Sequence, residues 1–136
     1  MIRCLVFIFI LCGALISCGD RKSQAYESAK EGLTDTMVVR MYKLAVEGHY
    51  EQYINAMASC KNATANYRKQ IELSLKQHQA EIIKSKQGVA KVEFVRATFH
   101  DNNQMANAFL NVTYKDNTVE EVLFPLVKEN GEWKIQ

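Results

Sequence analysis

The chain has 136 residues, of which 48% are hydrophobic and 24% charged, and its formal net charge is +2 at pH 7. This length fits one small domain whose core is large enough to need neither disulfides nor metal. The near balance of charges argues against a nucleic-acid-binding protein, which usually has a strongly basic face.

The first 17 residues have the pattern of a secretory signal peptide. A short positive start, Met1-Ile2-Arg3, precedes an apolar run from Cys4 to Ile16 that only Gly13 interrupts. A helix that spans a bilayer needs about 20 apolar residues, and this run is shorter. We therefore expect residues 1–17 to be a cleaved signal and not a permanent membrane span.

The sequence Leu15-Ile16-Ser17-Cys18 resembles the bacterial lipobox, in which a small residue precedes a cysteine that is diacylated on sulfur. The resemblance implies cleavage between Ser17 and Cys18 and attachment of fatty acyl chains such as palmitate to Cys18. Each buried methylene contributes roughly 0.8 kcal/mol to membrane binding, so several chains would hold the protein stably. The protein would then lie in the cell envelope, facing the periplasm or the cell exterior. The alternative is an uncleaved signal anchor with an incidental Cys18.

Cysteine usage agrees with this location. Cys4 and Cys12 would leave with the signal and Cys18 would carry lipid, so Cys60 is the one thiol left in the folded part. A single cysteine cannot form an internal disulfide. We expect Cys60 to be buried near a helix end, the alternative being a disulfide with another chain.

Residues 18–32 are expected to be the lipidated cysteine and a polar tether, and residues 33–136 a single domain. Asp35 or Thr36 is predicted to cap the first helix. Apolar residues then recur at helical spacing in two stretches, which Gly48-His49 separates. The first stretch contains Met37, Met41, Leu44 and Ala45, and the second contains Tyr50, Tyr53, Ile54, Met57 and Ala58.

The longest predicted helix spans Asn62 to Gln87. Asn62 and Thr64 are alternative caps, and Gly88 is expected to stop the helix. One line along this helix is apolar apart from a histidine, so His78 is predicted to face inward. The line consists of Tyr67, Ile71, Leu75, His78 and Ile82.

After Gly88 the pattern becomes alternating, which predicts strands over residues 89–100, 106–114, 118–128 and 132–135. In the first strand the apolar residues change face near Phe94-Val95, which predicts a β-bulge and a bend. Pro125 predicts an irregular or unpaired edge position. Asn130-Gly131 is a strong hairpin signal before the last strand.

Helices followed by hairpin-linked strands predict an α+β domain. We expect the N-terminal helices to pack on one face of a curved four-stranded antiparallel sheet and to form a cup with it.

Four features together resemble one group of proteins. They are the lipobox, the polar tether, a helix near Asp35-Thr36 that breaks at Gly48-His49-Tyr50-Glu51, and a closing hairpin from Phe124 to Ile135. The group consists of small bacterial lipoproteins of unknown function, formerly called lumazine-binding-like, with a cystatin-like or nuclear-transport-factor-2-like cone fold. The resemblance covers residues 33–136 and implies the fold and the envelope location. It carries no activity and no catalytic residues.

No catalytic constellation is found in the sequence. It contains no Gly-rich phosphate loop, no G-x-S-x-G turn and no Cys-x-x-Cys. His49, Cys60 and His100 do not have the spacing of metal ligands. We therefore expect no metal and no cofactor.

The candidate pocket residues are His78, Tyr53 and Tyr67. An inward His78 would serve as a ligand-binding or proton-accepting group, the alternative being a hydrogen-bonded histidine at the edge of the core. Tyr53 and Tyr67 belong to a set of tyrosines that either lines an aromatic pocket or simply forms core. The other members of the set are Tyr42 and Tyr50.

Three functions remain open. The leading hypothesis is a non-catalytic, lipid-anchored module that binds a small ligand, a peptide or an envelope protein in the cup. The second is a structural or assembly protein that docks or dimerises through the sheet face carrying Asn107, Phe109, Asn111 and Thr113. The third is an isomerase-like enzyme that uses His78.

Overall fold

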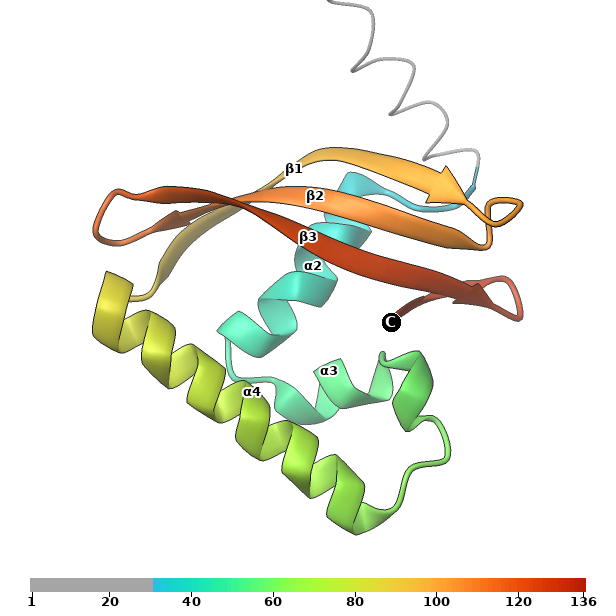
Figure 1. Ribbon diagram of the computed structural model, residues 1–136, viewed down its shortest axis with the longest axis horizontal. Coiled ribbons are helices and arrows are strands. Elements are labelled where there is room, and N and C mark those ends of the chain that lie inside the picture. Colours follow the sequence, from blue (N-terminus) through green and yellow to red (C-terminus); the bar gives the residue numbers. More distant parts are fainter. Residues whose placement is uncertain (1–30) are drawn as a thin grey trace, which may run out of the picture.

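The computed structural model describes residues 31–136, which form two layers, with three helices on one face of a single sheet (Figure 1). The predicted signal peptide, Cys18 and most of the tether lie outside the described residues. The helices are α2 (Asp35–Val46), α3 (Tyr50–Asn55) and α4 (Ala65–Lys86), with a short 3-10 turn η1 (Ala58–Cys60) before α4. The strands are β1 (Val89–His100), β2 (Met105–Tyr114), β3 (Val119–Glu129) and β4 (Glu132–Ile135).

The sheet is antiparallel throughout, with the strands in the order β1-β2-β3-β4. The predicted fold class, helices packed on a curved four-stranded antiparallel sheet, is therefore confirmed (Figure 1). Because strand order follows chain order, β1 and β4 are the outer strands, and no strand among residues 31–136 lies on the outer side of β1.

Strand β2 supplies the centre of the buried sheet face. Its residues alternate strictly between buried and half-buried, as a strand with one face on the core should. The side of β2 that the helices cover is apolar except for the hydroxyl of Tyr114. The predicted alternation of buried and more exposed residues along β2 is therefore confirmed. The buried residues are Ala106, Ala108, Leu110, Val112 and Tyr114.

The predicted bulge in β1 is present. Phe94 pairs with Leu110 and Arg96 pairs with Phe109, which leaves Val95 as an inserted residue between the two pairs. A second register shift lies between Val89 and Lys91. The insertion returns the apolar residues on both sides of it to the helix-covered face, since Val92, Phe94, Ala97 and Phe99 all pair with buried residues of β2.

Pro125 occupies a position where its missing N–H costs no strand pairing. It pairs with Asn107 of β2, and its carbonyl accepts a hydrogen bond from the Gln136 amide on the other side. The N and C=O of one strand residue point to the same side, so the ring nitrogen faces the end of β4 and not β2. Although β3 is an inner strand, Pro125 itself has no ladder hydrogen bond to donate to β2, as predicted for an edge-like position.

Two helix starts show where capping was correctly and incorrectly predicted. Thr64 caps α4, its hydroxyl accepting a hydrogen bond from the Tyr67 amide at 3.2 Å. Thr34, and not Asp35 or Thr36, caps α2 by accepting from the Met37 amide at 3.1 Å. The prediction was wrong by one residue because the Asp35 carboxylate turns to the adjacent Thr36 amide at 2.7 Å and lies inside the first turn.

A polar anchor at Glu31 lies two residues before the predicted start of the domain. The Trp133 indole N–H donates to the Glu31 carbonyl at 2.9 Å, and the Lys128 ammonium donates to the same oxygen at 3.3 Å. The Asn103 amide donates to the Glu31 carboxylate at 3.2 Å. Together with the fully buried Leu33, these contacts fix the chain over β4 before α2 begins.

Replacing Trp133 with Phe tests this anchor. The variant keeps an aromatic ring in the core but loses the hydrogen bond to Glu31 and part of the buried ring, so we expect the free energy of unfolding to fall by about 1–2 kcal/mol. The measurement is urea unfolding of the mature chain followed by far-UV circular dichroism. Ile83→Ala, at a side chain that is 61% exposed, is the control and should stay within about 0.5 kcal/mol. Equal stability of the Phe variant and the parent chain would contradict the anchor.

Candidate functional site

The interior of the predicted cup is filled by side chains of the protein itself. Tyr42 of α2 meets Phe124 of β3 edge-to-face with ring centroids 5.6 Å apart, and Phe99 lies 6.0 Å from Trp133. Tyr53 of α3 packs against the same core. Burial raises the pKa of both Tyr42 and Tyr53 above its usual value, as expected of phenols in an apolar interior.

The three predicted pocket residues are not brought together. Tyr53 is half-buried in the core, whereas Tyr67 is 42% exposed in the first turn of α4. His78 is also exposed, and its position eleven residues further along α4 places it about 16 Å from Tyr67 along the helix axis. No common pocket of these three residues exists in the described part of the chain.

The inward orientation predicted for His78 is wrong. Gln79 is the residue of that turn that is buried, at 9% exposure, and it is followed on the same face by Ile82. The inward line of α4 therefore continues from Leu75 by four residues and not three. One residue corresponds to a rotation of about 100°, which turns His78 out of the core.

The remaining histidines and the cysteine do not form a reactive group. His49 and His100 are exposed, and His49 lies 3.8 Å from Glu47. Cys60 is a buried free thiol in η1, as predicted. Within residues 31–136, no three His, Cys, Asp or Glu side chains are placed to hold a metal ion. None of the helices in this range has the length and apolar character needed to cross a membrane.

One hollow lies between α2 and β1, and we call it the α2–β1 groove. It consists of two adjoining hollows of about 550 and 370 Å³, which share residues of both walls and so run into one another. Helix α2 forms one wall with Asp35, Thr36, Val39, Arg40, Lys43, Val46 and Glu47. Strand β1 forms the other with Val89, Ala90, Lys91, Val92, Glu93 and Phe94.

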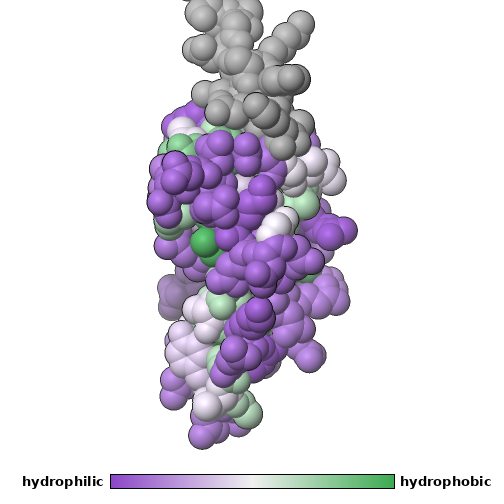
Figure 2. Space-filling model, turned by 90° about the vertical axis from the view of Figure 1, so that its right-hand side faces the viewer, coloured by the Kyte–Doolittle hydropathy of each residue, from purple (hydrophilic) through white to green (hydrophobic). Residues whose placement is uncertain are grey.

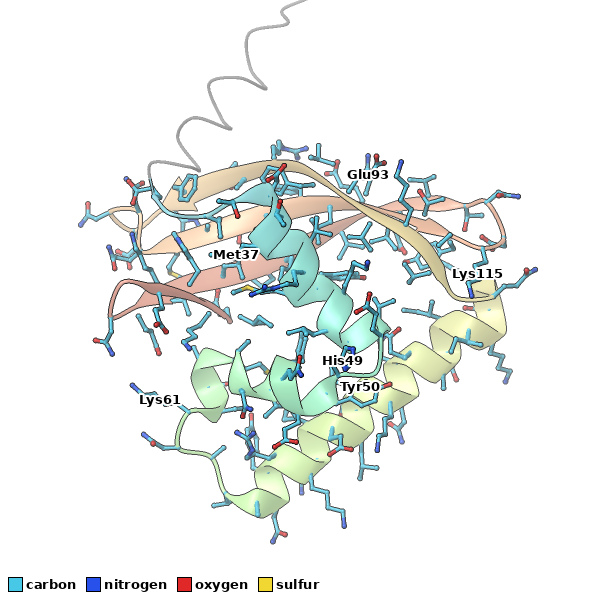
Figure 3. The ribbon with its side chains drawn as sticks, turned by 180° about the vertical axis from the view of Figure 1, so that it is seen from behind. Met37, His49, Tyr50, Lys61, Glu93 and Lys115 are labelled. Atoms are coloured by element: carbon cyan, nitrogen blue, oxygen red, sulfur yellow. The ribbon has the colours of Figure 1, made fainter. Side chains whose placement is uncertain are left out.

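The groove follows the free edge of the sheet. Six consecutive residues of β1, 89–94, line it, although successive side chains of a strand point to opposite faces. The two adjoining hollows together reach all six residues, which places the groove along the outer edge of the strand, where no strand among residues 31–136 pairs with it. Figure 3 shows α2 beside β1 in this region, with Met37 on the helix and Glu93 on the far side of the strand.

The groove combines apolar walls with charges that are mostly paired. Val39 and Val92 are contacted by both hollows. On the rim Lys43 binds Glu47 at 3.1 Å and Lys91 binds Glu93 at 2.8 Å. Within the described residues Arg40, which is exposed, makes no ion pair.

A second hollow of about 770 Å³ lies between the start of α4 and the β3–β4 turn. The side of the molecule that carries these segments is mainly hydrophilic (Figure 2). Its neighbouring arginine is already engaged, since Arg68 donates hydrogen bonds to the Asn55 side chain and to the Cys60 carbonyl. This hollow is therefore a broad, open surface at which the neighbouring arginine is not available to a ligand. Its lining consists of Ala58, Ser59, Lys61, Asn62, Ala63, Thr64, Tyr67, Glu129 and Asn130.

A polar cluster joins the end of α4 to the β2–β3 hairpin, and sequence patterns gave no sign of it. The Tyr114 hydroxyl donates to the Glu120 carboxylate at 2.6 Å, and Lys86 donates to the same oxygen at 3.0 Å while lying 4.2 Å from the centre of the Tyr114 ring. The Tyr114 hydrogen bond, followed by that of Lys86, lowers the pKa of Glu120. Burial and then the bond to Glu120 raise the pKa of Tyr114. All three groups are satisfied, so the cluster acts as a clamp on α4.

Comparison with known proteins shows the fold. A solved structure from Campylobacter jejuni, provisionally named an NTF2-like transpeptidase, matches with a TM-score of 0.59 and 12% sequence identity. The match covers 74% of this chain and 94% of that chain. The protein thus has a nuclear-transport-factor-2-like fold. No protein-family model and no curated protein matches the sequence.

The clamp predicts a pH dependence. Because the pKa of folded Glu120 lies below its ordinary value of 4.5, the carboxylate stabilises the fold above that pH, and this contribution is lost as the pH falls through the lowered pKa. We expect Glu120→Gln to be less stable than the parent chain at pH 6 and the difference to shrink steadily below pH 4.5. Urea unfolding from pH 6 to pH 3 measures it. Glu132→Gln, at a carboxylate 75% exposed, is the control, and a difference that does not change with pH would contradict the clamp.

Proposed function

We propose that this protein is a non-catalytic, membrane-anchored binding module that takes its ligand in the α2–β1 groove. The groove carries the proposal because it runs along the outer strand of the sheet, has apolar side chains in both walls and includes Arg40, which makes no ion pair within residues 31–136. Ligand sites of proteins typically combine an apolar lining with a few polar groups that fix orientation. Since aromatic side chains fill the cup, the groove replaces the cup as the place where a ligand fits.

The envelope location rests on the N-terminal sequence. Residues 1–17 are proposed as a lipoprotein signal peptide and Cys18 as the lipidated residue, in keeping with the resemblance to the small, formerly lumazine-binding-like lipoproteins. Cys18 precedes the anchored Glu31 by thirteen positions, a stretch that spans at most about 45 Å. The domain would work within that distance of the membrane, so its ligand is a molecule of the envelope.

We do not extend the transpeptidase activity in the Campylobacter protein's name to this chain. Such chemistry needs a nucleophile beside a group that activates it. In the described part of the chain Cys60 is 1% exposed, and the polar side-chain atom next to its sulfur is the Ser59 hydroxyl at 3.8 Å. The outward orientation of His78 likewise removes the basis for an isomerase-like enzyme.

The open face of the sheet supports a second candidate function, assembly with another protein. Phe109 and Leu123 are direct neighbours there, and Leu123 is 51% exposed. Arg96 lies 3.9 Å from the centre of the Phe109 ring and binds Glu121, so part of this apolar surface is already covered by the protein's own side chains. The predicted docking residues Asn107, Asn111 and Thr113 are half-buried on the same face.

Lipidation can be tested in the bacterial host. Full-length protein is expected to incorporate labelled palmitate and to sediment with membranes, and Cys18→Ala should lose both properties because the acyl acceptor is gone. Cys12→Ala, in the predicted signal, is the matched control and should keep the label. Label that persists in Cys18→Ala would refute the assigned lipid site.

Site-specific photocrosslinking in the same cells tests where the ligand binds. A photoreactive amino acid at Val39 probes the groove, one at Leu123 probes the open sheet face, and one at the exposed Ile83 of α4 is the control. We expect discrete adducts from position 39 and none from position 83. Adducts from position 123 alone would favour the assembly function over the binding module.

A further inference from the structure

We infer that the ligand of the α2–β1 groove is an extended peptide that adds to β1 as a fifth strand and places an acidic side chain opposite Arg40. This inference rests on the proposed function and specifies the ligand class of the same site.

The first ground is the unpaired backbone of β1. Within the described residues the strand pairs with β2 on one side only, and the consecutive residues 89–94 line the groove. The groove therefore presents the backbone N–H and C=O groups of the edge together with side chains. An extended peptide is the ligand that satisfies such a row of donors and acceptors, because main-chain hydrogen bonds supply affinity in strand addition.

The second ground is length. Register shifts lie between Val89 and Lys91 and between Phe94 and Arg96, so the segment Lys91–Phe94 is the regular stretch between two irregularities. This regular stretch of four residues is about 13 Å long at the rise of a strand. It accommodates about four residues of an added strand. The register shifts on its two sides would end the pairing.

The third ground is the chemistry of the walls. Side chains of an added strand alternate between the helix side and the open side of the sheet. Those on the helix side would meet the apolar Val39 and Val92. Lys43 and Lys91 are engaged in ion pairs with Glu47 and Glu93. Asp35, another charged lining residue, accepts hydrogen bonds from the adjacent Thr36. Arg40 makes no ion pair within the described residues and is therefore the charge that a ligand would complement. We therefore expect alternating apolar residues with one Asp or Glu.

Peptides can be selected and tested against the lipid-anchored protein extracted from its host in detergent. A phage-displayed library of random hexapeptides is the probe, and selected sequences are synthesised with and without N-methyl groups at alternate residues. N-methylation removes backbone donors while it keeps the side chains. Loss of two edge hydrogen bonds should weaken binding at least about tenfold.

Charge reversal tests the predicted contact with Arg40. Arg40→Glu should weaken binding of an acidic selected peptide at least about tenfold and improve binding of its Lys-substituted version. Lys84→Glu, an exposed position on α4 outside the groove, should leave both unchanged. Thermal unfolding of each variant separates loss of binding from loss of folding.

Each other result overturns part of the proposal. Strand addition is excluded if peptides bind equally well when either set of alternate residues is N-methylated. The acidic contact is excluded if Arg40→Glu does not change binding. Self-association of the chain that competes with the peptides would identify a second copy as the occupant. If no peptide is selected while position 39 still crosslinks in cells, the peptide class fails and the binding module stands. If position 39 gives no adduct, both fail.

Discussion

The packing of α2 against the buried face of the sheet is the constraint on which the rest of the structure depends. Val38 and Ala45, two helical turns apart, are buried on the core side of α2, and Val38 belongs to the same buried cluster as the core residues of β2. This contact fixes the rotation of the helix about its axis. Residues one position along, such as Val39, are turned by about 100° toward the edge of β1. The composition of the α2–β1 groove is thus a consequence of how α2 meets the core.

The filled cup follows from the small size of the domain. A cavity large enough for a ligand of about 300 Å³ would destabilise the fold by roughly 7 kcal/mol at about 24 cal/mol per Å³. That is comparable to the whole stability of a typical domain, about 5–15 kcal/mol. Tyr42, Phe124 and Trp133 fill the space instead. Concave surface remains where secondary elements meet at the periphery, as between α2 and β1.

The strands were predictable from sequence because each signal is local. Alternation in β2, the apolar change of face at Phe94-Val95 and the Asn130-Gly131 turn each depend on a few neighbouring residues. The rotation of α4 about its axis could not be predicted in the same way. After Leu75 the next inward residue can lie three positions further, at His78, or four positions further, at Gln79. Polarity does not decide between His78 and Gln79, and only the packed sheet does. The groove and the Lys86–Tyr114–Glu120 clamp join residues that are distant in sequence, so no pattern along the chain contains them.

An exposed strand edge is a hazard for a protein, because it can pair with any other extended chain. Two features of β1 limit such pairing. One is the pair of charged side chains Lys91 and Glu93, and the other is the bulge at Val95. The wall formed by α2 adds a third, since a partner strand must fit between helix and sheet. Together these features would restrict the edge to short peptides of the proposed pattern. An anchor at Cys18 would hold the domain near envelope partners and raise their effective concentration, so that such a short strand could bind weakly and still be occupied.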